Sequence, residues 1–388
     1  MKIIIDLGTL NINQSHIDKV VEALKSNRLS YGPMTALFEK RFAKKHGSEY
    51  GVFTNSGTDA LRATIHAMKI LYGWKDGDEI IMPATTFVAT YNVILQNNMK
   101  PVLVDINQDF NLDPELIEYK ITKKTRAIMP VHLLGKPADM RRINAIAKKY
   151  KLKTIADSCE TMGVEIGQAD VSCFSFYVAH LLVTGVGGMA ITNDKELSDL
   201  IRSLIFHGRD NKYLQINDDD EYSEEVINAR FRFNHPGYSS RGTEVEGALG
   251  LVELDLLDTN IKKRQTNARY LNDHLQHLPS KYLENNAFMM YPFLEFSGRR
   301  NDLMLFLEKR GIMTRTIMPL INQPYIKVEG EYPVSEVVLT NGLLFGVHQD
   351  LTVEDLKFIV GSIRLYYKFH AKVSLDTISL SMDKFYAK

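Results

Sequence analysis

The residues best suited to chemistry lie in one stretch, from residue 154 to residue 193. Asp157 closes a short apolar run, Ser175 lies in an aromatic run, and His180 follows five positions later. A carboxylate at a strand end, a hydroxyl and an imidazole can hold a cofactor and move a proton. No lysine occurs in this stretch. The pattern therefore predicts a cofactor site that has no amine nucleophile of its own.

A second candidate element is Ser56-Gly57-Thr58, which follows a strand-like run at residues 50–54 and opens a helical pattern. Backbone N–H groups at a helix N-terminus attract phosphate, and a hydroxyl adds a donor. An ordinary N-capped helix would show the same residues. The element alone does not decide between the two interpretations.

The elements that would position these residues alternate between strand and helix. Short Val- and Ile-rich runs between helical patterns predict an α/β fold with a mostly parallel central sheet, covered on both faces. Ligands bind beyond the carboxyl ends of the strands in such sheets, and five polar residues at predicted strand ends favour one shared site: Ser56, Thr86, His132, Asp157 and Ser175. The predicted strands are residues 50–54, 78–83, 100–105, 126–132, 153–157 and 189–192, and the predicted helices include residues 12–26, 35–46, 86–96, 114–120 and 140–151.

The second half of the chain is organised around a long helical pattern at residues 243–277, which we expect to be broken near Asp258. A smaller α+β region follows. The predicted division is a large cofactor-binding domain with an N-terminal arm at residues 1–255 and a small C-terminal domain at residues 256–388. Residues 209–240 are polar, with an acidic run, and form either an excursion toward a partner subunit or a solvated loop.

Composition excludes several classes of protein. Lys+Arg and Asp+Glu balance at 47 each, so no overall field favours nucleic acid or an acidic membrane. Two cysteines are too few for an iron–sulfur cluster or a cysteine-based zinc site, and no metal site is predicted. No run reaches about 18 apolar residues, and the N-terminus lacks a signal-peptide pattern. We therefore expect a cytoplasmic protein.

The motifs, in their order along the chain, resemble the DegT/DnrJ/EryC1/StrS sugar aminotransferases and dehydratases. The resemblance covers nearly the whole chain and rests on TNSGTDAL, DEIIMPATTFVAT, PVLVDI, MPVHLLGKPADM, DSCETMG, FSFYVAH, GVGGMAITN, GYSSR and NGLLFGVHQ. It implies a fold type I, aspartate aminotransferase-like three-layer fold with pyridoxal 5′-phosphate (PLP) as cofactor. It also implies a homodimer whose sites lie between two subunits.

The resemblance implies roles for residues of both candidate elements. Asp157 would pair with the pyridine nitrogen and keep it protonated, so that the ring withdraws electrons. Phe87 would stack on that ring, and Glu160 stands where aminotransferases of the family usually carry glutamine or histidine. The cofactor phosphate would be held by residues that offer N–H groups and hydroxyls, namely Ser56, Gly57, Thr58 and Ser175.

His180 stands where the family's aminotransferases have lysine, in a segment usually written SFYPTK. Lysine forms a Schiff base with the cofactor. Imidazole cannot do so, but it accepts and donates protons near neutral pH. The family's 3-dehydratases of nucleotide-linked 4-keto-6-deoxysugars share this substitution, and the resemblance implies their reaction. His180 would act as acid and base, the resting cofactor would be pyridoxamine 5′-phosphate (PMP), and L-glutamate would regenerate it.

One branch of these dehydratases binds an iron–sulfur cluster through four cysteines, which this chain lacks. The other branch favours a GDP-linked sugar in deoxysugar and O-antigen synthesis. Two alternatives stay open: a nucleotide-sugar aminotransferase that uses a different lysine, and a non-catalytic relative that binds a nucleotide sugar. Three features depart from the family pattern, namely a short segment at residues 162–174, Val186 in place of an acid, and Ser239 in place of an asparagine that reaches the partner's cofactor phosphate.

Cationic residues elsewhere are candidates for contacts with the sugar or the diphosphate. Arg315 ranks first because its surroundings resemble the family's substrate side. Each candidate is also a common structural residue, since arginine pairs readily within folds. The candidates are His132, His207, Arg209, Arg241, Arg315 and His348.

Overall fold

The computed structural model describes residues 5–210, 224, 228, 231–371 and 384–386. The acidic run expected in the polar excursion lies outside these residues. None of the helices within them is both long and apolar enough to cross a membrane.

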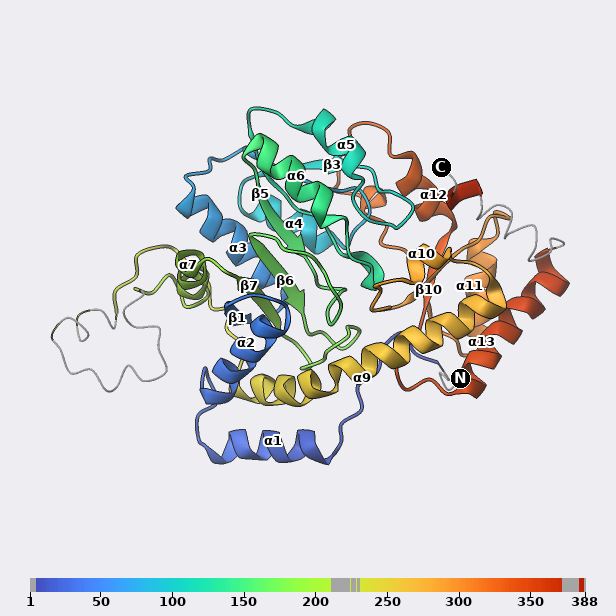
Figure 1. The fold of residues 1–388 in the computed structure, drawn as a ribbon, viewed down its shortest axis with the longest axis horizontal. Helices are drawn as coiled ribbons and strands as arrows, with labels where there is room; N and C mark the ends of the chain where they lie inside the picture. The colour runs from blue at the N-terminus through green and yellow to red at the C-terminus, as the bar shows by residue number, and fades with distance from the viewer. Residues whose placement is uncertain (1–4, 211–223, 225–227, 229–230, 372–383, 387–388) are drawn as a thin grey trace.

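A seven-stranded sheet forms the centre of the molecule (Figure 1). Its strands are β1 (Tyr50–Thr54), β2 (Glu79–Pro83), β3 (Lys100–Val104), β4 (Thr125–Ile128), β5 (Lys153–Asp157), β6 (Val171–Ser175) and β7 (Gly188–Thr192). They lie in the order β1-β7-β6-β5-β4-β2-β3. Only β7 pairs antiparallel, with β1 on one side and β6 on the other. The predicted α/β fold with a mostly parallel sheet is therefore confirmed.

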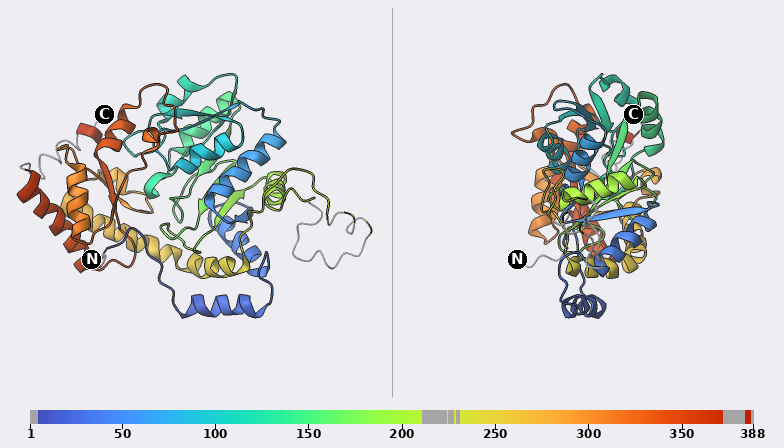
Figure 2. Two further views of the ribbon diagram at one scale, coloured as in Figure 1. Left: turned by 180° about the vertical axis from the view of Figure 1, so that it is seen from behind. Right: turned by 90° about the vertical axis from the view of Figure 1, so that its left-hand side faces the viewer.

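Helices cover both faces of this sheet (Figures 1 and 2). Successive strand residues point to opposite faces, so Ile80 joins one apolar cluster and Ile81 another. The first cluster contains α3 (Gly57–Leu71), α4 (Val88–Gln96) and α7 (Lys195–Ile205), and the second contains α5 (Pro114–Ile117) and α6 (Met140–Tyr150). Burial on both faces explains why the strands are continuous apolar runs.

Helix α9 (Glu244–Leu275) runs along both parts of the molecule as one element of 32 residues (Figure 1). The predicted break near Asp258 is wrong. Buried Leu257 and Ile261 carry the apolar stripe past that point, and the carboxylate of Asp258 pairs outward with Lys45. Helices α1 (Gln14–Lys25) and α2 (Pro33–Lys45) pack against the first half of α9.

A second, antiparallel sheet of three strands lies beyond α9, in the order β8-β10-β9. Its elements are β8 (Tyr291–Leu294), β9 (Thr314–Thr316) and β10 (Gly342–Phe345), with α10 (Ser280–Leu283), α11 (Arg300–Lys309), α12 (Pro333–Asn341) and α13 (Val353–Tyr366) around them. The division proposed between residues 255 and 256 falls inside α9, so this helix contributes to both parts.

Candidate active site

The carboxyl ends of β1 and β6 bring the predicted site residues together. Ser56 forms an isolated bridge with Gly187, just before β7. Gly57 lies so close to β6 that a Cβ atom on it would stand 2.7 Å from Ser175 Cβ and 2.7 Å from Cys159 Sγ. Ser56, Gly57 and Ser175 thus lie side by side, as the strand-end pattern predicted.

Helix α3 begins at this cluster. The Ser56 side chain caps it by accepting a hydrogen bond from the Asp59 amide at 3.1 Å. Gly57 and half-buried Thr58 form the first turn, whose N–H groups have no partners within the helix. The free donors and the positive end of the helix dipole suit a phosphate group.

Asp157 ends β5 and is almost fully buried. Its Oδ2 accepts a hydrogen bond from the Thr90 hydroxyl at 2.8 Å, and its Oδ1 accepts one from the Cys159 amide at 3.1 Å. Burial raises the pKa of the carboxyl, while the donors from Cys159 and Thr90 oppose that rise. A buried carboxylate gains from a cationic partner, which a pyridinium N–H provides. Thr90 is a site residue that the sequence did not single out.

Phe87 lies just before α4 and exposes 57% of its surface. The hydroxyl of the preceding Thr86 is 2.9 Å from the Thr90 hydroxyl, which in turn donates to Asp157. This chain of hydroxyls fixes the Phe87 turn relative to the carboxylate. The exposed ring is therefore available to stack on a flat group beside Asp157.

His132 lies fully buried beneath the end of β5. Its backbone amide donates to the Asp157 carbonyl at 2.9 Å, and its Nδ1 accepts from the Ala138 amide at 3.0 Å. Burial lowers the pKa of the imidazole to about 4, so the ring is neutral with its proton on Nε2. That N–H has no partner within the described residues and is fully buried, so it is not open to a group bound at the site.

His180 lies in the turn that follows β6. Its Nδ1 is 3.2 Å from the Ser175 carbonyl oxygen. Because a carbonyl only accepts, Nδ1 carries the proton and Nε2 holds the free lone pair. Burial lowers the pKa of His180 to about 4; the Ser175 carbonyl opposes this shift, and the nearby Arg264 charge adds to it. The half-buried ring is a neutral proton acceptor near neutral pH.

Glu160 is a buried acid next to Asp157. Its Oε2 accepts a hydrogen bond from the Leu134 amide at 2.8 Å. Burial raises the pKa of Glu160 to about 7, with a further rise from the charge of Asp157 and an opposing effect of the Leu134 amide. The carboxyl therefore changes charge near neutral pH.

A Glu160→Gln variant of the cofactor-free protein should melt at a higher temperature than the wild type at about pH 8, and at a similar temperature near pH 4. The folded-state pKa of about 7 lies above the ordinary value of 4.5, so wild-type stability falls as the pH rises between these values. Since one pKa unit corresponds to about 1.4 kcal/mol, the ionised Glu160 lowers the free energy of unfolding of the wild type by about 3 kcal/mol at high pH. Exposed Glu165, changed to glutamine, is the control, and equal melting temperatures at about pH 8 would contradict the burial of a charged Glu160.

Two of the arginines proposed for substrate contacts lie near β1 and α7. The backbone of exposed Arg241 bridges to Thr54, at the carboxyl end of β1, and its guanidinium stands 4.9 Å from the centre of the Phe206 ring. The guanidinium of half-buried Arg209 stands 5.6 Å from the Phe233 ring. Arg241 is thus brought to the edge of the site.

The remaining candidates are dispersed. His207 is exposed after α7, in a left-handed backbone conformation with φ 66°. Arg315 is exposed on β9 of the small sheet and donates to the neighbouring Thr314 carbonyl at 2.7 Å. His348 is buried, and its Nδ1 lacks a partner within the described part of the chain. The structure does not gather these three with Asp157.

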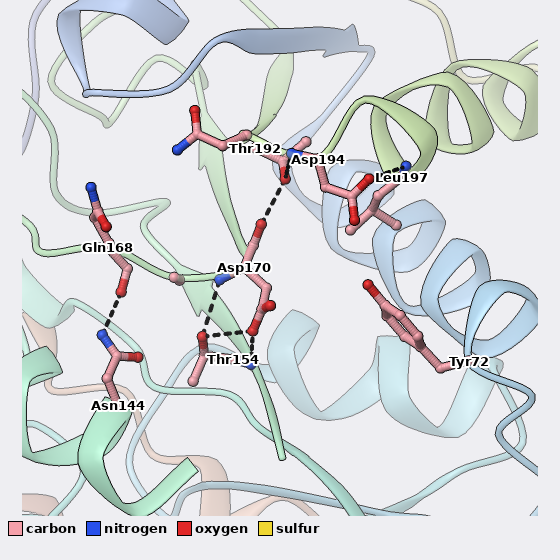
Figure 3. Close-up of a pocket in the computed structure, with 10 residues that line it drawn as sticks. Tyr72, Asn144, Thr154, Gln168, Asp170, Thr192, Asp194 and Leu197 are labelled. Carbon is pink, nitrogen blue, oxygen red and sulfur yellow. Dashed lines mark hydrogen bonds between the residues drawn. The ribbon is translucent and has the colours of Figure 1, made fainter. Parts of the chain in front are cut away.

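A separate polar cavity of about 570 Å³ lies at the opposite, amino-terminal end of β5 and β6 (Figure 3). Its groups bind one another. Asp170 accepts hydrogen bonds from the Thr154 amide at 2.8 Å and the Thr154 hydroxyl at 3.1 Å, and its carbonyl accepts from the Thr192 hydroxyl at 2.7 Å. Because these donors are already used, the strand ends near Asp157 remain the better candidate site.

The residues present fit a pyridoxal cofactor. The site combines a helix N-terminus for the phosphate, a buried carboxylate for the ring nitrogen, and an exposed aromatic ring. A sheet of this topology with such a site at its carboxyl edge defines a PLP-dependent enzyme of the aspartate aminotransferase type.

The chain belongs to the DegT/DnrJ/EryC1/StrS aminotransferase family, whose model matches residues 10–364. It is 32% identical to GDP-perosamine synthase of Escherichia coli O157:H7 over 90% of this chain and 94% of that protein. It is also similar to the structure of E. coli GDP-4-keto-6-deoxy-D-mannose-3-dehydratase with bound hydrated PLP, with a TM-score of 0.85, 26% identity, and coverage of 94% of this chain and 100% of that one.

A third similar protein is NtdA of Bacillus subtilis with bound PMP, with a TM-score of 0.79, 28% identity, and coverage of 92% of this chain and 83% of that one. The predicted family, fold class and cofactor are confirmed. The protein is an enzyme of a PLP-dependent, sugar-modifying family, and the relatives that it resembles include proteins named as sugar aminotransferases and as GDP-perosamine synthases.

Proposed function

We propose that the protein removes the C3 hydroxyl of a nucleotide-linked 4-keto-6-deoxyhexose. The resting enzyme would hold the cofactor as PMP, and L-glutamate would convert PLP back to PMP after each turnover. A GDP-linked sugar is the first candidate substrate. The observation that carries this proposal is that His180 follows β6 where aminotransferases of the family have lysine, with Nδ1 held by Ser175 and Nε2 free. The similarity to the E. coli 3-dehydratase supports it.

The proposed mechanism assigns the chain's residues to binding, orientation and proton transfer. When bound, PMP supplies an amine that condenses with the 4-keto group and leaves as ammonia, and two electrons that replace the C3–O bond with C3–H as PLP forms. The first turn of α3 binds the phosphate, Phe87 orients the ring, and Asp157 keeps the ring nitrogen protonated. His180 Nε2 accepts a proton and, as imidazolium, delivers it to the departing C3 oxygen.

Arg241 is the proposed contact for the sugar nucleotide, since it is the cationic candidate at the carboxyl end of β1. The proposed active unit is a homodimer. Sedimentation of a fully active monomer would contradict this last point.

A second candidate function is transamination at C4 of the same kind of sugar. The similarity to GDP-perosamine synthase favours it. Transamination leaves nitrogen on the sugar, whereas dehydration releases it as ammonia, so the two functions differ in where the nitrogen ends.

The experiment begins with purified protein, PLP and L-glutamate, and follows the change from aldehyde to PMP absorbance. A panel of GDP-, CDP-, UDP- and dTDP-linked 4-keto-6-deoxysugars is then added, and ammonia is measured. We expect stoichiometric ammonia with at least one sugar, first of all the GDP-linked one. A C4 amine without ammonia would support the aminotransferase, and cofactor binding without turnover would support a non-catalytic relative.

A further inference from the structure

The turn that carries His180 is closed by hydrogen bonds at its base. The Phe176 amide donates to the Gly187 carbonyl at 2.9 Å, and the Thr184 amide donates back to the Phe176 carbonyl at 3.0 Å. The side chain of Val183, next to Thr184 where the chain returns to the base of the turn, is buried. The base of the turn therefore follows β6, and the His180 amide donates to the Tyr177 carbonyl at 2.9 Å within the turn. The segment between His180 and Thr184 leaves room for a contact from another element.

Glu253 of α9 supplies such a contact. Its Oε2 accepts a hydrogen bond from the Val183 amide at 3.4 Å, and its Oε1 accepts one from His16 Nε2 at 3.0 Å. The side chains of His16 and Glu253 are 0% and 8% exposed. One buried carboxylate thus joins three elements, the His180 turn, α9 and the N-terminal helix α1.

His16 is held from its other side as well. It lies in the first turn of α1, where the Asn13 side chain accepts from the His16 amide at 3.3 Å. His16 Nδ1 is 2.9 Å from the Asn13 side-chain oxygen and 3.3 Å from the Asn13 amide nitrogen. Helix α1 runs alongside α9 (Figure 1). Both ring nitrogens therefore have partners, and the position of the imidazole is fixed by the docking of α1.

The N-terminal arm touches the same turn at a second point. Gly8 packs against its backbone, so that a Cβ atom on Gly8 would stand 3.0 Å from Ala179 Cα, next to His180. The arm before α1 thus contacts the turn at Ala179, the residue before His180. The first turn of α1 reaches it through Glu253 at Val183, three residues after His180.

We propose that Glu253 is a positioning residue for His180, and that docking of α1 through His16 sets the place of the imidazole. The proposal rests on the role of His180 proposed above. A buried carboxylate is costly to leave unpaired, and the burial of Glu253 therefore favours keeping both of its donors. A displacement of the proton acceptor by about 1 Å can lower the reaction rate about 10²-fold. The hydrogen bond between Glu253 and Val183 is therefore expected to affect kcat.

The test uses the full-length protein loaded with PMP, and compares Glu253→Met, which removes both acceptor oxygens at similar length, and His16→Leu with a control, Asp255→Asn. Asp255 lies nearby on α9 and forms an exposed pair with Arg41. We expect faster amide hydrogen exchange in the turn around Val183 and a kcat about 10²-fold lower in Glu253→Met, with KM and PMP affinity unchanged. His16→Leu should act in the same direction, the double variant should be no worse than the stronger single one, and Asp255→Asn should match the wild type.

A folded Glu253→Met variant with wild-type exchange at Val183 and wild-type kcat would overturn the proposal. Should that variant fail to fold, a folded His16→Leu variant with wild-type exchange and kcat would overturn it equally. The two proposals fail separately. Faster exchange at Val183 in the Glu253 and His16 variants, together with a fully active His180→Asn variant, would support the contact between Glu253 and the turn. It would refute the chemical role of the imidazole.

Discussion

A His180→Asn variant is expected to bind PMP as the wild type does, and to release ammonia from GDP-4-keto-6-deoxymannose about 10²- to 10⁴-fold more slowly. The asparagine amide can still donate to the Ser175 carbonyl that holds Nδ1 at 3.2 Å, so the turn should persist. It cannot accept a proton at the position of Nε2. Ammonia release in a single turnover measures the rate, and PMP absorbance after gel filtration measures binding.

A His180→Lys variant is the matched comparison. It should attach PLP covalently, as lysine does in aminotransferases, and should also lose dehydration. In the wild type, kcat/KM should show no acid limb from His180 near its ordinary value of 6.5, because the folded pKa is about 4 and the rate falls only as the pH drops through that value. Full dehydration by His180→Asn would remove the imidazole from the mechanism.

An Asp157→Asn variant is expected to form PMP from PLP and glutamate about 10²- to 10³-fold more slowly, and to bind the cofactor more weakly. The amide keeps the shape of the side chain: its oxygen can still accept from the Cys159 amide, which donates to the carboxylate at 3.1 Å, and its NH2 can donate to the Thr90 hydroxyl, which donates to the carboxylate at 2.8 Å. It cannot balance a protonated ring nitrogen. The rate of the absorbance change with glutamate measures the effect.

A Thr90→Val variant serves as the milder partner of that experiment. It leaves the carboxylate but removes one of its donors, which costs about 1–3 kcal/mol when the acceptor is buried. Its rate should lie between those of the wild type and Asp157→Asn. Wild-type rates in Asp157→Asn would mean that this carboxylate does not serve the ring nitrogen.

The shared site at the strand ends followed from the sequence because its cause is local. Short apolar runs with both faces buried identify parallel strands, and the residue after each run must lie at the carboxyl edge of the sheet. Ser56, Asp157 and Ser175 were placed together on this ground, and the contacts of Gly57 with β6 agree with it.

The long-range contacts did not follow from the sequence. The continuity of α9 past Asp258 depends on buried partners of Leu257 and Ile261 that lie elsewhere in the chain. Strand β10 lies in a stretch noted only as a motif, because its pairing with β8 and β9 is not a local property.

The polar contacts of the site could not be predicted from the sequence for a similar reason. The Thr90 hydroxyl reaches Asp157 from another element, and Glu253 reaches Val183 across 70 positions. A hydroxyl in the first turn of the helix after β2 was the available signal for Thr90. For Glu253 the signal was an acid on the apolar face of a long helix.

The most direct test of the proposed function is one turnover of the PMP-loaded protein with GDP-4-keto-6-deoxymannose, with the sugar product examined by mass spectrometry and NMR. The proposal predicts a product that lacks the C3 oxygen, keeps the 4-keto group and contains no nitrogen, with one ammonia released per PMP consumed. A product that keeps the C3 hydroxyl and carries an amine at C4 would contradict it.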